Sequence, residues 1–374
     1  MNVLFFAWKD IRHPLAGGAE VILHELASRL VKDGHQVTIL TASYDDAPSE
    51  DTIDGISIIR VGSNRYLHSM QATHYYRKFL RHKFDIVIET VNTAPYFHFI
   101  AKSSAKSYLF YHQLAREIWF HETPAPLSYI GYGILEPLAT FILGKTRAKT
   151  ITISESTKKD LINFGFKSDN ISIISEAIHL KPVEDLSNIT KFNKPTILSL
   201  GSLRPMKRTL EQVKAFEIAK RSKPDLQMKI SGDSKSRYGQ QVLDYIAASP
   251  YKRDIEYLGR VTDQEKEQLM RKAHLIAVTS IKEGWGLIVT EAASQGTPAV
   301  VYDVDGLRDS VRDNETGIIS ATNPNSLAKG IVELLDNTER YERIRHAAWE
   351  WSKHITFDQS YKDFKAAIRV EGKK

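Results

Sequence analysis

The amino-acid sequence predicts an α/β protein built from two similar units, each with a parallel β-sheet covered by helices. Short apolar runs with strand character alternate with helical segments twice along the 374 residues, before and after a polar segment at residues 181–195. Strands that alternate with helices are typical of parallel sheets with both faces covered. A hydrophobic content of 42% is enough to form a core in each unit.

The first half begins with a short apolar run that we expect to form a buried strand. It lacks the positive leader, long apolar stretch and cleavage site of a signal peptide, so export is not expected. The hydrophobic pattern of this half predicts helices at residues 18–33 and 64–83. It also predicts strands at residues 3–8, 36–42, 56–61, 86–89, 108–112 and 150–153.

The second half repeats this scheme after a polar, proline-flanked segment that is typical of a linker. We place the domain boundary there, which gives units at residues 1–191 and 192–355. Strands are predicted at residues 196–200, 227–231, 255–258, 275–279 and 299–302. Helices are predicted at residues 209–221, 240–248 and 263–272, with a short one that ends at residue 295. Ligands of open parallel sheets bind at the carboxyl ends of the strands, so we expect the substrate in a cleft between two facing units.

The segment from Glu283 to Glu291, Glu-Gly-Trp-Gly-Leu-Ile-Val-Thr-Glu, carries the strongest functional signal of the chain. Gly284 and Gly286 allow the backbone to approach a ligand, and the N–H groups at the start of the following helix favour an anion. A carboxylate repels a phosphate, so we expect both glutamates to accept hydrogen bonds from neutral hydroxyls, such as those of a sugar and a ribose. The pattern therefore predicts a nucleotide-sugar site.

This segment resembles the paired-glutamate motif of family 4 glycosyltransferases, which has the same seven-residue spacing between the glutamates. The resemblance covers most of the chain, from residues 17–20 (Gly-Gly-Ala-Glu) through residues 201–207 (Gly-Ser-Leu-Arg-Pro-Met-Lys) to the second unit. It implies the GT-B fold, in which two Rossmann-like α/β domains face each other across a cleft. It also implies that a C-terminal helix within residues 356–374 crosses back to the N-terminal, acceptor-side domain.

The resemblance implies a role for each candidate residue of the second unit, the nucleotide-sugar-binding domain. Glu283 would bind hydroxyls of the sugar, and Glu291 would bind the ribose. Lys207 and Arg204 lie in the loop after a predicted strand, where they would neutralise the diphosphate leaving group. The family usually has an arginine directly after the glycine that ends this strand. Ser202 stands at that position here, so Arg204 would act in place of the family arginine.

The remaining donor contacts that the resemblance implies come from backbone groups and from the first unit. The amides of Gly286 and Leu287 would bind a phosphate. Gly17 and Gly18, in the loop between the first predicted strand and helix, would face the diphosphate and the sugar. His112, at the end of the predicted strand 108–112, would contact the transferred sugar.

The activity that the resemblance implies is transfer of a hexose from a UDP- or GDP-sugar to an acceptor hydroxyl, with retention at the anomeric carbon. In the mechanism most often proposed for the family, a donor phosphate oxygen takes the acceptor proton, so no protein base is required. Asp303-Val-Asp305-Gly306 is similar to the two-aspartate metal motif of the other main glycosyltransferase fold. It follows a predicted strand and ends in Asp-Gly, a common turn signal, so we predict a turn and a reaction without a metal or other cofactor.

The charge pattern of the chain limits the kinds of partner that the protein could bind. The net charge of +6 is concentrated between residues 60 and 149, and residues 64–83 combine lysines and arginines with apolar residues at helical spacing. This pattern predicts a basic amphipathic helix. Such a helix could contact an anionic membrane surface or a phosphorylated acceptor. Alternatively, it is an ordinary surface helix that buries one apolar face. The basic excess is too small and too mixed with acids to indicate nucleic-acid binding.

The compartment is inferred from cysteine usage and hydropathy. The chain contains no cysteine, which excludes disulfides, thiolate nucleophiles and cysteine-based zinc sites and fits a cytoplasmic protein. The longest apolar stretch, residues 127–143, is interrupted by Glu136-Pro137 and two glycines and falls short of the ~20 uninterrupted apolar residues of a spanning helix. We predict no transmembrane segment, and a peripheral position on the inner membrane face stays open.

Other functions fit parts of the pattern. A nucleotide-sugar epimerase shares the architecture but needs further acid–base residues that the sequence does not reveal. A non-catalytic sugar-nucleotide-binding module would keep the site and form no product with candidate acceptors. A dehydrogenase is disfavoured, because no Gly-x-Gly-x-x-Gly fingerprint follows a first strand. For the glycosyltransferase, we expect an acceptor from cell-envelope synthesis, either a lipid-linked intermediate or a saccharide.

Overall fold

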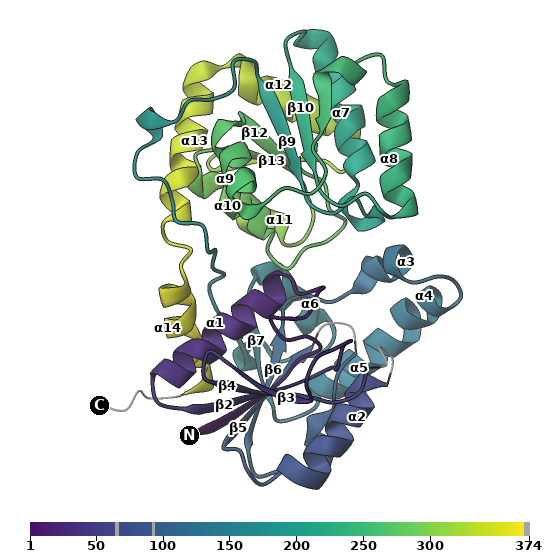
Figure 1. Ribbon diagram of the computed structural model, residues 1–374, viewed down its shortest axis with the longest axis vertical. Coiled ribbons are helices and arrows are strands. Elements are labelled where there is room, and N and C mark those ends of the chain that lie inside the picture. The colour runs from purple at the N-terminus through teal and green to yellow at the C-terminus, as the bar shows by residue number, and fades with distance from the viewer. Residues whose placement is uncertain (64–66, 92–93, 370–374) are drawn as a thin grey trace. The chain divides into compact units, whose positions relative to one another are not determined.

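The computed structural model describes residues 1–63, 67–91 and 94–369 (Figure 1). The chain forms two compact α/β units, each with its own parallel sheet, as the sequence predicted. The first unit comprises residues 1–119 and 125–177 together with the C-terminal segment from Phe357. The second comprises residues 120–124 and 178–356.

The first unit contains an eight-stranded sheet with the order β3-β4-β2-β1-β5-β6-β7-β8. Neighbouring strands run parallel except at one edge, where β3 and β4 are antiparallel. The strands are β1 (Asn2–Phe6), β2 (Gln36–Thr41), β3 (Glu50–Ile53), β4 (Ile56–Arg60), β5 (Ile86–Val91), β6 (Lys106–Tyr111), β7 (Lys149–Thr152) and β8 (Ile171–Ile173).

Helices cover both faces of this sheet. The α-helices of this unit are α1 (Gly18–Lys32), α2 (His68–Tyr75), α4 (Leu127–Ile130), α5 (Glu136–Gly144), α6 (Glu155–Asn163) and α14 (Phe357–Ile368), whereas most of α3 (Trp119–Glu122) belongs to the second unit. Two π-helical turns continue them, η1 (Tyr76–Leu80) and η4 (Gly131–Leu135), and the 3-10 turns are η2 (His98–Ala101), η3 (Arg116–Ile118) and η5 (Ser168–Asn170).

One face of the sheet is covered by α2, η1 and α5. Val87 of β5 belongs to the same buried cluster as Tyr76 of η1. Val91, four residues further along the same strand, belongs to a cluster with Leu143 of α5. Residues four apart on a strand point to the same side, so both helical segments pack on one face. Figure 1 likewise shows α2 and α5 on the side of the first sheet away from α1 and α14.

The opposite face carries α1 and the C-terminal helix α14. Phe5 of β1 stacks on Phe364 of α14, with ring centroids 6.3 Å apart. Asp33, which ends α1, accepts hydrogen bonds from the Tyr361 hydroxyl at 2.8 Å and from Lys365 Nζ at 2.9 Å. The last described helix of the chain is therefore part of the first unit.

The second unit contains a six-stranded parallel sheet with the order β11-β10-β9-β12-β13-β14. Its strands are β9 (Thr196–Leu200), β10 (Gln227–Ser231), β11 (Ile255–Tyr257), β12 (Leu275–Val278), β13 (Ala299–Tyr302) and β14 (Gly317–Ser320). Its α-helices are α7 (Thr209–Ser222), α8 (Arg237–Ala248), α9 (Asp263–Lys272), α10 (Leu287–Ser294), α11 (Leu307–Ser310), α12 (Pro324–Asp336) and α13 (Thr338–Ser352). The 3-10 turns are η6 (Leu186–Asn188), η7 (Pro205–Lys207) and η8 (Lys252–Asp254).

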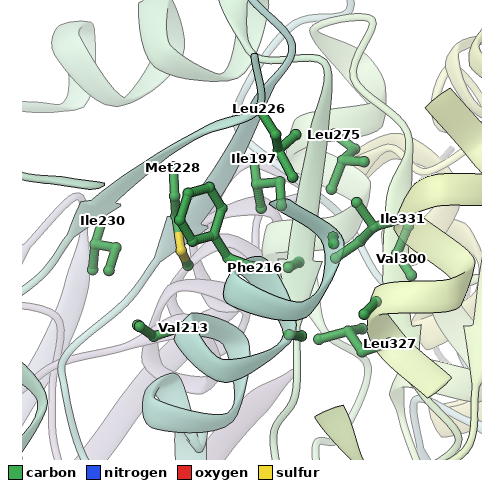
Figure 2. Close-up of a cluster of buried hydrophobic side chains, with 14 of the residues drawn as sticks. Ile197, Val213, Phe216, Leu226, Met228, Ile230, Leu275, Val300, Leu327 and Ile331 are labelled. Carbon is green, nitrogen blue, oxygen red and sulfur yellow. The ribbon is translucent and has the colours of Figure 1, made fainter. Parts of the chain in front are cut away.

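Alternating side chains of the second sheet form a core on each face. Ile197 belongs to the cluster under α7 and α12, while its neighbour Leu198 belongs to the cluster under α9 and α10. Figure 2 shows the first cluster, in which Phe216 of α7 lies between strand residues such as Met228 and the α12 residues that include Ile331. Burial of these apolar side chains holds the sheet rigid beneath the loops at its carboxyl edge.

The division between the units differs from the predicted boundary. It falls after Ala177, whereas the sequence indicated a boundary after residue 191. The intervening segment is bound to the second unit by distant partners: the Val183 N–H donates to the Ser294 carbonyl at 2.9 Å, and the Trp349 indole donates to the Val183 carbonyl at 2.8 Å. A polar, non-periodic sequence conceals such contacts, because the partners lie more than a hundred residues away.

Three strands were not predicted. β3 is the charged edge strand Glu-Asp-Thr-Ile, β8 is the three-residue strand Ile-Ser-Ile, and β14 is Gly-Ile-Ile-Ser. Such short segments show too little alternation for a pattern search, and their pairing with a sheet edge comes from tertiary context.

The basic helix predicted at residues 64–83 is shorter than expected, and residues 64–66 lie outside the described part of the chain. It comprises α2 and η1, and its buried face is formed by His68, Ala72, Tyr76 and Leu80. Met70 and Phe79, two of the apolar residues of the predicted amphipathic helix, are exposed.

Candidate active site

Three neighbouring strands of the second sheet lead into loops that contain predicted site residues or the predicted Asp-Gly turn. The loops after β9, β12 and β13 contain Lys207, Glu283 and Asp305, and these strands are adjacent in the sheet. Parallel neighbours end at the same edge, so their loops meet there. Two backbone hydrogen bonds join them, from the Ile281 N–H to the Met206 carbonyl at 2.8 Å and from the Glu283 N–H to the Asp305 carbonyl at 3.0 Å.

Lys207 and Glu283 form an ion pair between their ammonium nitrogen and Oε1. The Ser280 hydroxyl donates to the same carboxylate oxygen at 2.6 Å. The buried Thr279 hydroxyl donates to the Lys207 carbonyl at 2.9 Å and so fixes the turn η7 that presents the lysine. The structure thus brings together two of the predicted residues and adds two hydroxyls that hold them.

The turn before α10 requires glycine at Gly286. Its φ is +91°, a left-handed conformation that glycine adopts without strain. A Cβ at this position would lie 2.8 Å from the Leu307 side chain and 3.0 Å from the Ser310 hydroxyl. Gly284 lies half-buried in the same turn. The helix begins at Leu287, and its first N–H groups have no acceptor within the helix, so they are available to an anion.

Glu291 lies one turn into α10 and is also paired with a lysine. Its Oε2 accepts a hydrogen bond from Lys266 Nζ of α9 at 3.1 Å. Each glutamate of the motif therefore carries one cation, Lys207 on Glu283 and Lys266 on Glu291. The paired charges reduce the repulsion that two carboxylates would exert on an anion at the helix N-terminus.

Residues 303–306 form the predicted turn. Asp303 and Asp305 accept hydrogen bonds from Arg308 at 2.6 and 2.8 Å, and Asp305 also accepts one from Lys282 at 2.8 Å. A Cβ on Gly306 would lie 2.2 Å from the Glu283 carbonyl oxygen, so the glycine lets this turn lie against the Glu283 backbone. Within the described ranges, no three His, Asp or Glu side chains gather in a way that could hold a metal ion.

Arg204 is placed differently from Lys207. Its N–H donates to the Ser202 carbonyl at 2.8 Å, so the chain bends back sharply after the end of β9. The side chain is exposed at the N-terminus of η7, whereas Lys207 is half-buried. Lys207 is therefore the cation that the structure fixes on the Glu283 carboxylate, and a diphosphate contact of Arg204 stays a prediction.

The first unit also has polar side chains from three adjacent strands at the carboxyl edge of its own sheet. β1, β5 and β6 are adjacent, and Lys9, Thr90 and His112 lie at or just beyond their carboxyl ends. These residues line a small pocket together with Glu20 from the first turn of α1. The pocket therefore combines an ammonium group, a carboxylate, a hydroxyl and an imidazole.

Gly17 and Gly18 form the start of α1, as the sequence predicted. The Gly17 N–H donates to Oε2 of Glu20 at 2.7 Å, and Lys9 Nζ lies 3.7 Å from Oε1 of the same carboxylate. The backbone donor that we expected to face a phosphate is thus taken by Glu20. The φ of Gly17 is −139°, which any residue adopts, so the missing side chain provides space rather than a special conformation.

His112 follows β6 and is only 8% exposed. Its ring stacks on Phe110 with centroids 4.5 Å apart. Burial lowers the pKa of His112 to about 4, so the imidazole is neutral at physiological pH. A neutral imidazole donates one hydrogen bond and accepts one, which suits it to a sugar hydroxyl.

Six residues of these two clusters were given no role from the sequence: Lys9, Glu20, Thr90, Lys266, Thr279 and Ser280. Glu20 has a sequence signal, because a glutamate three residues after a helix-start residue is typical of a capping box. Lys9 directly follows the first predicted strand, which is also a recognisable position. Lys266 has no comparable signal among the charged residues of α9.

Two family models match successive parts of the chain. Residues 16–181 match the model described as Glycosyltransferase Family 4, and residues 184–351 match the one described as Glycosyl transferases group 1. Together the two matches cover nearly all of the described chain.

Curated relatives match over nearly the whole chain as well. An uncharacterised glycosyltransferase of Methanocaldococcus jannaschii is 24% identical over 363 residues, which cover 90% of each chain. A phosphatidyl-myo-inositol mannosyltransferase of Mycobacterium tuberculosis is 25% identical over 359 residues, again 90% of each chain.

Solved structures share the fold along the full length. Sucrose-phosphate synthase from Thermosynechococcus elongatus superposes with a TM-score of 0.78 at 15% identity, covering 98% of each chain. HepE from Anabaena, solved in complex with UDP and glucose, superposes with a TM-score of 0.72 at 16% identity, covering 99% of each chain. The chain thus has the GT-B fold and belongs to the family 4 glycosyltransferases.

Proposed function

We propose that this glycosyltransferase moves a hexose from a nucleotide diphosphate sugar to an acceptor hydroxyl, with retention of configuration at the anomeric carbon. The observation that carries the proposal is the pair of lysine-bound glutamates on either side of the N-terminus of α10. A nucleotide diphosphate sugar has a matching pattern, an anionic diphosphate with neutral hydroxyls on both sides. The HepE complexes with UDP and with UDP-glucose support this choice of donor.

In this proposal, the second unit binds the nucleotide diphosphate. The amides of Gly286 and Leu287 donate to a phosphate at the helix N-terminus. Lys207 supplies the positive charge that stabilises the departing diphosphate, and Arg204 adds a second charge from its exposed position. Glu291 binds the ribose hydroxyls, and its pairing with Lys266 fixes the carboxylate for that contact.

Glu283 and the first unit bind the sugar in this proposal. The Glu283 carboxylate, held by Lys207 and Ser280, accepts hydrogen bonds from sugar hydroxyls. His112 exchanges hydrogen bonds with the transferred sugar as a neutral imidazole. The Glu20 carboxylate next to Gly17 makes the loop before α1 better suited to hydroxyls of the sugar than to its phosphates.

The proposed transfer step needs no protein base. The acceptor oxygen forms its bond to the anomeric carbon on the face from which the diphosphate oxygen departs. The acceptor proton passes to a phosphate oxygen of the leaving nucleotide diphosphate, so atoms and charge balance. We propose that Lys207 and the helix N-terminus stabilise the leaving group without a metal, since Asp303 and Asp305 are already engaged by Arg308 and Lys282.

The first experiment is thermal unfolding of the protein with UDP-glucose, UDP-galactose, UDP-GlcNAc and GDP-mannose, with NAD as control. A ligand at 100 times its dissociation constant stabilises the folded state by ~2.7 kcal/mol. We expect stabilisation by one nucleotide class and its loss in Glu291→Ala. No shift with any nucleotide sugar would contradict the proposed donor site.

Product formation separates the enzyme from a binding module. With the stabilising donor and candidate acceptors, either saccharides or lipid-linked saccharides, Glu283→Ala should reduce transfer by at least about a hundredfold. The same variant should largely keep its affinity for the nucleoside diphosphate, because the amides at the start of α10 and Glu291 are proposed to bind it without Glu283. An equal loss of transfer and of nucleotide affinity would refute this division of roles.

A further inference from the structure

The segment Leu127–Gly144 forms a continuous run of α4, η4 and α5 in the first unit, and one side of it is fixed to the unit. Glu136 is buried, and its carboxylate accepts hydrogen bonds from the N–H groups of Ala115 at 2.6 Å and Arg116 at 2.8 Å. It also accepts one from the Trp119 indole at 3.2 Å. Leu143, the penultimate residue of α5, is 1% exposed in the core.

The other side of this helix is apolar and exposed. Ile134 is 58% exposed, Leu138 is 55% exposed and Phe141 is 50% exposed, and they follow one another at spacings of four and three residues. These spacings place the three side chains on one helix face. Further exposed apolar residues of the segment are Tyr129, Ile130, Leu135 and Ile142. A surface helix ordinarily turns polar residues outward, so this face indicates a partner that covers it.

Exposed apolar side chains are not spread evenly over the protein. Among the described residues, every large hydrophobic side chain that is exposed lies between Met1 and Ile162, and most lie on helices of the first unit. Met70 of α2 and Phe79 of η1 belong to this set. Since α2, η1 and α5 cover the same face of the first sheet, their outward sides form one layer of the unit.

Positive charges accompany this apolar layer. Between residues 60 and 149 the sequence contains twelve lysines and arginines against five carboxylates, and two of those five, Glu89 and Glu136, are buried. Arg77 and Lys78 are exposed on η1, and Lys145 and Arg147 are exposed directly after α5. Lys78 lies over the exposed Phe79 ring at 5.0 Å and Lys145 over the exposed Phe141 ring at 4.9 Å. Cations beside exposed aromatic and aliphatic side chains are typical of segments that lie in a membrane interface.

We propose that the outer face of residues 127–144, together with α2 and η1, docks this protein on the surface of an anionic lipid bilayer. The helix lies along the interface rather than crossing it, although its length and composition would allow a span. If the helix crossed the bilayer, Glu136 would lose the N–H donors that bind its carboxylate and would be an unpaired charge in an apolar environment. Leu143 would leave the core of the unit and a cavity would remain there.

A second copy of the chain is a weaker candidate for this surface. A two-fold contact would bring the same face of each copy together, and with it Arg77, Lys78, Lys145 and Arg147 of both copies. Like charges across an interface oppose association, whereas anionic head groups complement them. The proposal does not depend on the identity of the sugar donor, so it can hold or fail independently of the proposed function.

The test is sedimentation of the full-length protein with two kinds of vesicle, phosphatidylcholine alone and phosphatidylcholine with about one third phosphatidylglycerol. We expect binding to the anionic vesicles that weakens at high salt, since exposed charges are screened. The triple variant Ile134→Gln, Leu138→Gln and Phe141→Gln should lower the partition coefficient by about tenfold or more. Its thermal unfolding should match that of the wild type, because these side chains are already exposed.

Leu143→Ala is the matched control, since it removes apolar volume from the opposite face of the same helix. It should unfold at a lower temperature, yet bind vesicles within about twofold of the wild type below that temperature. Equal binding of the wild type to both kinds of vesicle would overturn the charge argument. If the triple variant sedimented with anionic vesicles to the same extent as the wild type, the assignment of this helix face would be wrong. If the wild type binds neither kind of vesicle but forms a dimer, and the triple variant is monomeric, the surface contacts a second copy instead.

Discussion

Lys207 and Glu283, which are 76 residues apart in the sequence, form an ion pair at the carboxyl edge of the second sheet. The lysine ends the turn after β9 and the glutamate follows β12, and these two strands are neighbours. Both side chains are only partly exposed, 26% and 18%. Two residues that were predicted to have separate roles, one at the diphosphate and one at the sugar, therefore form one ion pair.

Because Lys207 and Glu283 form one ion pair, we expect the losses in kcat/KM on replacing them to be non-additive. We expect Lys207→Met and Glu283→Gln each to lower kcat/KM by at least about a hundredfold, and the double variant to lose little more than either single variant. The reason is that removal of one partner leaves the other misplaced, so the second removal has little left to disrupt. The measurement is kcat/KM for the four proteins. Additive losses of transition-state free energy would show that the two residues act separately.

Lys223 and Asp336 provide the control for these variants. They form an ion pair elsewhere on the second unit, with Asp336 58% exposed, and neither residue belongs to the site. Because exposed pairs contribute about 0–1 kcal/mol, Lys223→Met should leave kcat/KM and stability nearly unchanged.

Gly286 should tolerate alanine poorly. Alanine at φ +91° costs roughly 1–2 kcal/mol of backbone strain. Its Cβ would also lie within 3.0 Å of Leu307 and Ser310, so we expect about 2–4 kcal/mol of lost stability together with lost nucleotide binding.

Gly259 is the matched control for Gly286. It has a φ of +67°, and a Cβ there would meet nothing within 4 Å. Gly259→Ala should therefore show the backbone strain alone, about 1 kcal/mol, with nucleotide binding retained. Urea denaturation and nucleotide titration of both variants measure the difference. If the two glycines respond equally, close packing at Gly286 has no part in the effect.

The sequence was informative for residues in the loops that follow strands. Glu283, Gly286 and His112 could be placed at the carboxyl edge of a sheet because loops at this edge of a parallel sheet are short and their positions follow from the strands. The same logic explains why the two α/β units could be predicted, since buried parallel strands have long apolar runs.

Residues whose partners are set by helix packing could not be predicted in this way. Lys266 meets Glu291 because α9 packs beside α10, and the charged sequence of α9 does not indicate which lysine faces the site. Arg204 is a different case, because its position in the sequence motif did not reveal that the chain bends back at Ser202, and its diphosphate contact stays a prediction. For Lys266 the deciding contact is tertiary, whereas for Arg204 it is a local backbone hydrogen bond.

Lys191 should be important for stability, although the sequence placed it in a linker. Its ammonium group donates to the carbonyls of Ala273 at 2.8 Å, Gly296 at 2.7 Å and Arg271 at 3.0 Å. Lys191→Met would leave these acceptors without their donor, so we expect a loss of about 2–3 kcal/mol. Lys194→Met, at an exposed lysine of the same segment, should change stability by less than about 0.5 kcal/mol. Equal urea midpoints for the two variants would show that the segment is a linker after all.

His274 should make the second unit acid-sensitive. Its Nδ1 accepts a hydrogen bond from the Thr196 N–H at 3.1 Å, and burial, followed by the charges of Lys191 and Arg345, lowers its pKa from 6.5 to about 4. The unfolded chain binds the proton below pH 6.5 and the folded chain does so only near pH 4, so stability is lost as the pH falls between these values, by about 2–3 kcal/mol. His274→Gln, which keeps an acceptor for Thr196, should flatten this dependence in denaturation measured across that range. The exposed His346→Gln should leave it unchanged, and the same slope in all three proteins would place the acid sensitivity elsewhere.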